Sequence, residues 1–259
     1  MPTPLLKIQI PSIYPTDNPG LLPSRMAMCT PDTKNAVFAI ASDVAAAGGK
    51  LVLTDMFRSY LMQLQSHNDF VSHKKTAFSP APGGSLHEAG RAMDIDLNKI
   101  HVSLAQFWEI AQRHGFSPII KAPTPGVSES WHFDCRGSHG IVYDYYTAGK
   151  GNNMKPYAAM AASAILSIGV SVDQFKGKER QALIQSALIR LGHDIGSIDG
   201  SIGNHTMSAL QQEGITSTDV NSIVEALHQK LQQKFPGEYE IKSDDVTTHA
   251  DNLFGVSEN

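Results

Sequence analysis

The chain has 259 residues, of which 41% are hydrophobic, so it is long enough to bury a core in one large domain or two modest ones. Its 25 acidic residues outnumber its 21 lysines and arginines, and the formal net charge of -4 leaves no basic stripe that would neutralise a run of phosphates. We therefore expect no nucleic-acid partner.

Membrane insertion and Sec-dependent secretion are also disfavoured. The most apolar window, residues 157–172, is rich in Ala and Ser and shorter than a spanning helix needs, so we expect no membrane span. The N-terminus lacks the charged start, the apolar run and the small-residue cleavage site of a secretory signal. No Sec route is visible in the sequence.

The chain begins with a proline-rich segment. Seven prolines in the first 31 residues exclude a long helix and predict an extended arm along the surface. After this arm, residues 33–47 carry apolar side chains at helical spacing up to Gly48, residues 51–53 have the pattern of a short buried strand, and residues 60–70 are helical again.

Cys29 and Cys135 are the only cysteines of the chain. They lie far apart and have neither CxxC nor zinc-finger spacing. A disulfide stays open on this pattern, but two buried thiols are favoured.

Two strands are predicted around charged side chains. Residues 92–97 alternate in polarity and place Asp94 on one face of a half-buried strand. Residues 104–114 form an amphipathic helix, and the alternation then returns around His132, which shares a strand face with Asp134.

A polar linker divides the chain. Residues 149–153 are Gly, Lys, Gly, Asn and Asn, and the composition after them is helical to about residue 235. We therefore predict one domain over residues 1–150, including the N-terminal arm, and a helical domain over residues 154–236. Residues 237–259 are polar and acidic, which predicts a loose tail.

The second predicted domain has two amphipathic helices that flank a glycine-rich loop. Asp199 and Gly200 make the turn, and Thr206 caps or begins the following helix. Regular acidic positions are missing, so we discount calcium binding. The apolar residues expected to fill the core are Leu183, Leu188, Leu191, Ile198, Ile202 and Leu210.

Three residues form a candidate metal site. Catalytic zinc needs about three protein ligands and one open position, and imidazole and carboxylate are suitable donors. His87 stands on a loop, Asp94 stands on the next strand, and Gly90 allows a tight turn between them. His132 supplies a second imidazole.

Glu129 precedes His132 by three residues. Positions three apart face opposite sides of a continuous strand, so Glu129 reaches the metal only from a turn that enters the strand, which the Pro125–Gly126 pair permits. No histidine follows His87 at the spacing of the His-Glu-x-x-His helix, so that arrangement is excluded.

The glycine-led Ser-x-His, the Asp after it and the downstream Glu-x-Trp-His together resemble the zinc peptidase family of D-alanyl-D-alanine carboxypeptidases and L-alanyl-D-glutamate endopeptidases. VanY-type enzymes and several phage endolysins are relatives. The resemblance implies an α+β fold with a small antiparallel sheet and flanking helices, and one Zn²⁺ per chain. It assigns His87, Asp94 and His132 as zinc ligands and Glu129 as catalytic base.

The resemblance extends upstream to residues 57–63, which look like the family's Tyr-Arg-Ser-Tyr segment ending in Gln. It implies that Arg58 contacts the substrate and steadies the oxyanion, and that Gln63 and Ser85 bind substrate. The alternatives are an Arg58 paired with Asp55, a Gln63 on a helix face and a Ser85 in a turn. Phe57 in place of tyrosine, and the residues after Trp-His-Phe, depart from the family and leave the substrate open.

The Leu-Gly and Asp-Gly-x-x-Gly-x-x-Thr pattern between residues 191 and 206 is similar to the peptidoglycan-binding domain of many wall hydrolases. A generic three-helix module is the alternative. Together the resemblances imply an endolysin-like protein that acts on peptidoglycan at the cell wall or periplasm. We expect it to be a monomer. Because no Sec signal is visible, we expect phage-type or other export. Two alternatives stay open: a catalytically silent wall-binding protein on the same scaffold, and a zinc-site domain of the related hedgehog type. The bond that is cut also stays open.

Overall fold

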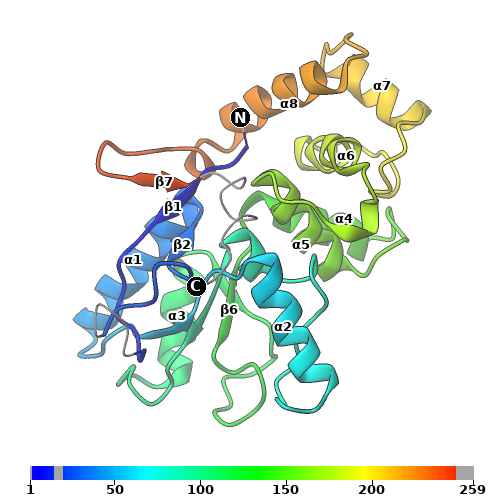
Figure 1. The fold of residues 1–259 in the computed structure, drawn as a ribbon. Helices are drawn as coiled ribbons and strands as arrows, with labels where there is room; N and C mark the ends of the chain where they lie inside the picture. Colours follow the sequence, from blue (N-terminus) through cyan, green and yellow to red (C-terminus); the bar gives the residue numbers. More distant parts are fainter. Residues whose placement is uncertain (1, 15–19, 249–259) are drawn as a thin grey trace.

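A computed structural model describes residues 2–14 and 20–248 of the chain. The fold is α+β, with two small antiparallel sheets in the N-terminal half and a group of helices after them (Figure 1). The predicted α+β class, with a small antiparallel sheet, flanking helices and a C-terminal helical bundle, is confirmed. No helix among these described residues is long and apolar enough to cross a membrane.

A four-stranded sheet carries the residues of the candidate site. Its neighbouring strands are all antiparallel, and Asp94 lies directly opposite His132 across the central pair. The strand order is β3 (Leu53–Asp55), β4 (Ala92–Ile95), β6 (His132–Cys135) and β5 (Phe116–Pro118).

Helices α1 (Pro31–Ala46) and α3 (Leu104–Arg113) pack with this sheet in one hydrophobic core. Phe107 of α3 meets Phe133 of β6 edge to face, with ring centroids 4.8 Å apart. Helix α2 (Tyr60–Val71) follows β3 and begins at Ser59, whose hydroxyl accepts a hydrogen bond from a helical amide. These elements match the predicted ones to within two residues at each end, because local signals mark their ends: Gly48 and Gly115 follow α1 and α3, and Ser59 caps α2.

The second sheet corrects two expectations for the chain ends. Strand β1 (Leu5–Lys7) lies between β2 (Met28–Cys29) and β7 (Val246–Thr248). Leu6 is fully buried, so the N-terminal segment over residues 2–14 is extended as predicted but is not a surface arm. Residues 15–19 of the predicted arm lie outside the described residues. Strand pairing on both sides of β1 satisfies its backbone polar groups, which allows it to be buried.

The segment after Pro236 is likewise more ordered than predicted as far as the structure describes it. The 3₁₀ turn η4 (Pro236–Glu238) buries Glu238 against two arginines, and β7 pairs with β1. The expectation of a loose tail was wrong for this part, because the partners lie far away in sequence. Residues 249–259 of the predicted tail lie outside the described residues.

The helical half forms the second hydrophobic core and occupies the upper right of Figure 1. Its helices are α4 (Gly140–Thr147), α5 (Pro156–Ser167), α6 (Glu179–Leu191), α7 (Asn204–Gln212) and α8 (Val220–Lys234). The short turns η2 (Gly137–His139) and η3 (Asp173–Phe175) precede α4 and α6. Of the six predicted core residues, Leu188, Ile198 and Leu210 are buried, and the other three pack partly buried against them.

The helical core continues across the predicted boundary at residues 150–154. It includes Leu86 and Ala89 of the turn η1 (Leu86–Ala89), which α5 packs against. Every residue of α5 from Ala159 to Ser167 is buried. The division into two domains stays a prediction.

Both cysteines are free and buried, which confirms the preference for two thiols. Burial raises the pKa of the Cys135 thiol to about 12. Burial also raises the pKa of Cys29. Neither thiol is therefore ionised near neutral pH.

Candidate metal centre

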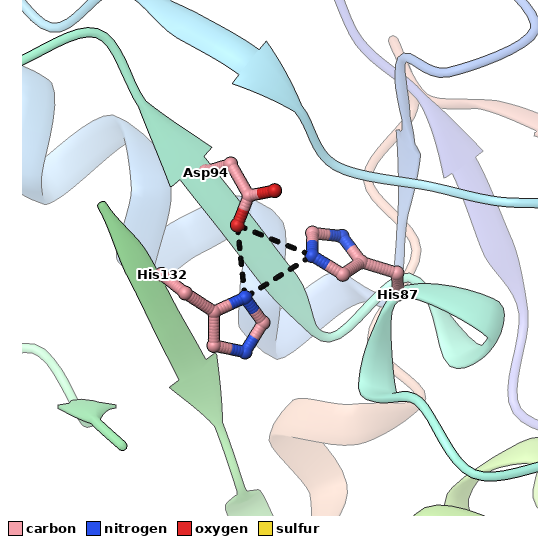
Figure 2. Close-up of side chains that lie close together, drawn as sticks. All are labelled: His87, Asp94 and His132. Carbon is pink, nitrogen blue, oxygen red and sulfur yellow. Dashed lines mark hydrogen bonds and ion pairs between the residues drawn. The ribbon is translucent and has the colours of Figure 1, made fainter. Parts of the chain in front are cut away.

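His87, Asp94 and His132 lie together in the structure, as the sequence predicted (Figure 2). His132 Nδ1 is 2.8 Å from Asp94 Oδ1, and His87 Nε2 is 3.3 Å from the same oxygen. The two nitrogens are 3.2 Å apart. All three residues are buried. Three potential ligand atoms from three separate elements therefore point to one place.

The sheet brings two of the ligands together. Asp94 and His132 are directly opposite partners on the antiparallel strands β4 and β6. Opposite residues project their side chains from the same face of a sheet with Cβ atoms about 4.5–5.5 Å apart. The carboxylate and the imidazole therefore meet without any unusual backbone geometry.

A tightly closed turn positions the third ligand. Ser85 Oγ accepts a hydrogen bond from the His87 amide, and the Glu88 carboxylate accepts from the amides of Gly83 and Ser85, which closes a capping box around η1. Gly90 ends the turn in the left-handed conformation with φ 62°. The turn that the sequence predicted at Gly90 is present and directs His87 toward β4.

Hydrogen bonds to the outer ring nitrogens fix which nitrogen of each histidine faces the centre. His87 Nδ1 lies 2.9 Å from the Met56 carbonyl oxygen, which can only accept, so Nδ1 carries the proton. His132 Nε2 lies 2.9 Å from Asp134 Oδ1 and donates to that carboxylate. In the neutral imidazoles, His87 Nε2 and His132 Nδ1 therefore present lone pairs.

The arrangement requires a positive charge at its centre. Two imidazole lone pairs and a carboxylate oxygen repel one another unless a proton or a metal ion lies between them. Burial raises the pKa of Asp94, but the charges and hydrogen bonds of His87 and His132 outweigh burial and hold that pKa well below its ordinary value. Burial lowers the pKa of His132, but Asp134 and Asp94 raise it well above its ordinary value.

A zinc ion fits this donor set. Two imidazole nitrogens and one carboxylate oxygen are the ligands of a common class of catalytic zinc sites, which keep a further position open. The outer hydrogen bonds to Met56 and Asp134 are of the kind that orient histidine ligands in metal proteins. The residues present therefore fit the metal that the sequence predicted.

Glu129 lies in the turn that enters β6, where the sequence required it to be. Its backbone is left-handed with φ 68°, and its carbonyl oxygen accepts a hydrogen bond from the His132 amide at 3.1 Å. Burial raises the pKa of the Glu129 carboxyl; the charge of His132 opposes this rise, and the charge of Asp94 adds to it. The carboxyl thus lies within the electrostatic field of the centre, while its role as base stays a prediction.

Arg58 lies at the edge of the centre. Its Nη2 donates to Asp94 Oδ2 at 3.2 Å, its Nε to Asp55 Oδ2 at 2.5 Å and its Nη1 to Gln63 Oε1 at 3.3 Å. The alternative pairing with Asp55 is therefore present, but the same guanidinium also contacts the proposed ligand Asp94. Burial lowers the pKa of Arg58, and the neighbouring carboxylates Asp55 and Asp94 raise it above its ordinary value.

The two weaker sequence candidates have structural partners. Gln63 is fully buried, donates to Ser79 Oγ and the Pro80 carbonyl, and accepts from Arg58. Ser85 caps η1. Both residues thus hold other parts of the site in place, and their contact with substrate stays a prediction.

Sequence reasoning missed Tyr157 as part of the site. Its hydroxyl lies 3.2 Å from Asp134 Oδ1, the oxygen that also accepts from His132. The shared strand face of His132 and Asp134 was readable from their alternation. Nothing in the sequence pointed to Tyr157, because it lies on α5 in the predicted second domain.

Comparisons with known proteins find solved structures that are only weakly similar to this chain. No protein-family model and no curated protein matches the chain. A solved structure of the LD-carboxypeptidase LdcB, described as revealing the basis of peptidoglycan recognition, matches with TM-score 0.41 and 18% identity over 51% of this chain and 68% of its own. An L,D-carboxypeptidase DacB from Streptococcus pneumoniae matches with TM-score 0.32 and 24% identity over 41% of this chain and 65% of its own. Overlaps of this size establish no shared activity, so the function is inferred from the side chains of the site.

Proposed function

We propose that this chain is a zinc peptidase that hydrolyses peptide bonds in the stem peptides of peptidoglycan. The observation that supports it most is the convergence of three buried ligand atoms whose outer hydrogen bonds leave their lone pairs facing one point. A structural ion pair does not need both histidines held in these tautomers. A metal site does.

His87 Nε2, Asp94 Oδ1 and His132 Nδ1 would hold the zinc ion. When bound, zinc acidifies a water molecule and polarises the carbonyl oxygen of a peptide bond. The other side chains of the site would transfer the protons and stabilise the remaining charge.

Glu129 is the proposed general base. A raised pKa brings a carboxylate closer to the operating pH, which favours both taking a proton from water and returning it to the leaving amine. Arg58 keeps its positive charge at the edge of the site, where it can stabilise an oxyanion.

The peptidoglycan part of the proposal depends on the sequence resemblances in both halves of the chain. A wall-binding segment at residues 154–236 would hold the peptidase at the polymer and raise its effective concentration there. This role for the helical half is also a proposal.

The test is digestion of purified sacculi by the full chain, with mass spectrometry of the released fragments. We expect fragments that end within the stem peptide, loss of release with a chelator, and recovery when zinc is added back. One zinc ion per chain should be found by elemental analysis. Release that is unaffected by chelator, or no release by zinc-loaded protein, would contradict the proposal. The fragment masses also identify the bond that is cut.

A further inference from the structure

Asp134 is a buried carboxylate with few partners. It is 0% exposed, and its two donors among the described residues, His132 Nε2 and Tyr157 Oη, share its Oδ1 oxygen. Its Oδ2 has no hydrogen-bond partner among the described residues. A buried carboxylate with so few donors depends strongly on each one.

Tyr157 determines how Asp134 is oriented. A phenol is protonated near neutral pH and donates, so Tyr157 holds the Oδ1 oxygen in place beside the His132 ring. His132 Nε2 needs that same oxygen to keep its proton on the outer nitrogen. Loss of the Tyr157 hydroxyl leaves His132 Nε2 as the one donor among the described residues that holds this carboxylate in place.

Helix α5, which begins at Pro156 and carries Tyr157, also supports the other histidine. It packs against η1, the turn that carries His87, and Leu86 and Ala89 of that turn share a core with α5. One helix therefore lies behind both imidazole ligands. It packs against the turn that carries His87, and it donates a hydrogen bond to Asp134, the carboxylate that accepts from His132.

We propose that Tyr157 is a positioning residue of the metal centre. It orients Asp134, which in turn orients the ligand His132, so helix α5 contributes to the geometry of the centre. This inference depends on the proposed zinc site. It adds to that proposal a residue and a helix from beyond the predicted peptidase domain.

The first experiment compares zinc affinity, measured by competition with a chromophoric chelator, in the full chain and in Tyr157→Phe. Mutations of residues that hold metal ligands typically weaken metal affinity by about 10- to 100-fold, and we expect Tyr157→Phe to lie near the lower end. Tyr146→Phe is the matched control. It also removes a hydroxyl from the helical half, one that donates to Asn153 and accepts from the Ile198 amide instead of contacting Asp134. Its zinc affinity should equal that of the wild type.

The second experiment tests whether Tyr157 acts through Asp134. Asp134→Asn should weaken zinc binding more than Tyr157→Phe, because it removes the charge that His132 faces. In the double variant, Tyr157→Phe should add little further loss, since its target carboxylate is already gone. Losses that add fully would show that Tyr157 acts by another route.

The outcomes separate this inference from the proposed function. Wild-type affinity in Tyr157→Phe or in Asp134→Asn would overturn the inference, as would equal losses in Tyr157→Phe and Tyr146→Phe, which would indicate general destabilisation. If the wild-type chain binds zinc but digests no sacculi, the proposed function fails while this test stays valid. If the wild-type chain binds no zinc, both fail.

Discussion

At the scale of single residues, the site depends on side chains whose local geometry is set by their neighbours. Glu129 is a non-glycine residue with φ 68°, a conformation that costs about 1–2 kcal/mol in an L-residue. The turn from Val127 to His132 holds it there through two backbone hydrogen bonds. Strain of this kind is found where a side chain must point in one particular direction.

Replacing Glu129 separates chemistry from metal binding. Glu129→Gln keeps the size of the side chain but removes the base, so we expect turnover of stem peptides to fall by about a hundredfold or more. Zinc content should stay at the wild-type level, because Glu129 is not among the three ligands. The measurements are fragment release and elemental analysis of the same preparation. Near-normal turnover would remove Glu129 from the mechanism.

Replacing Arg58 with lysine tests whether activity needs the branched guanidinium group or only its positive charge. Arg58→Lys keeps the charge but cannot donate at once to Asp55, Gln63 and Asp94. Loss of a single stabilising donor typically lowers kcat by about 10²- to 10³-fold, and we expect an effect toward the lower end because the charge remains.

The matched control for Arg58 is Arg113→Lys. Arg113 is a surface arginine that pairs with Asp43 and is 62% exposed, so its replacement should leave kcat unchanged. Equal kcat values for Arg58→Lys and the wild type would show that Arg58 is only a structural partner of Asp55.

At the scale of elements, the turn η1 shows why a glycine is required. A Cβ added at Gly90 would lie 2.9 Å from Cys29 Cα and 3.1 Å from the Met28 carbonyl oxygen. Both contacts are with backbone of strand β2, which cannot move without breaking the second sheet. Gly90 thus allows η1 and β2 to pack closely, and this packing places His87.

The prediction at this scale compares two left-handed glycines. Gly115, with φ 81°, has open space around the position of its Cβ, so Gly115→Ala carries only the conformational cost of about 1–2 kcal/mol. Gly90→Ala adds a backbone clash, and overpacking of this kind costs a further amount of about 1–3 kcal/mol. Urea unfolding of both variants measures the difference. Equal destabilisation would mean that the β2 contact is unimportant.

The elements also show which features a sequence predicts and which it does not. Helices α1, α2 and α3 and strands β4 and β6 follow signals that act over a few residues, such as apolar spacing, the capping Ser59 and the glycines after α1 and α3, and the ligand spacing lies within the same local pattern. Pairing of β1 with β7 depends on segments at opposite ends of the chain. The contact of Tyr157 with Asp134 depends on how α5 packs. Contacts between segments far apart in the chain produce no periodic pattern in the sequence. The sequence therefore predicts the two chain ends less well than the convergence of the three candidate ligands.

At the scale of the whole molecule, one buried charge network joins the two halves of the chain. Glu238 of η4 accepts from Arg190 of α6 at 2.5 Å and lies 3.3 Å from Arg91, which also pairs with Asp32 of α1 at 2.7 Å. Arg91, Arg190 and Glu238 are at most 4% exposed. Arg91 stands between the ligands His87 and Asp94 in sequence, so the network ties the C-terminal segment to the loop that carries the site.

Because of this network, the free energy of unfolding should depend on Glu238 and on the pH. Removing one partner of a buried ion pair typically destabilises by about 3–5 kcal/mol, because a buried charge loses its compensation. Burial raises the pKa of Glu238, but Arg91 and Arg190 outweigh burial and hold it below the ordinary value of 4.5. A carboxylate with a lowered folded-state pKa contributes stability above the unfolded-state value and loses it as pH falls through the folded-state value.

We therefore expect Glu238→Gln to be less stable than the wild type by about 3–5 kcal/mol near neutral pH in urea unfolding. The gap should narrow only as pH falls below 4.5, where the wild-type carboxylate becomes protonated. Glu213→Gln is the matched control, since Glu213 pairs with His193 and Lys230 but is 19% exposed. A surface pair of this kind contributes about 0–1 kcal/mol. If Glu238→Gln cost no more than Glu213→Gln, the C-terminal segment would not stabilise the fold, and its burial against Arg91 and Arg190 would have no energetic consequence.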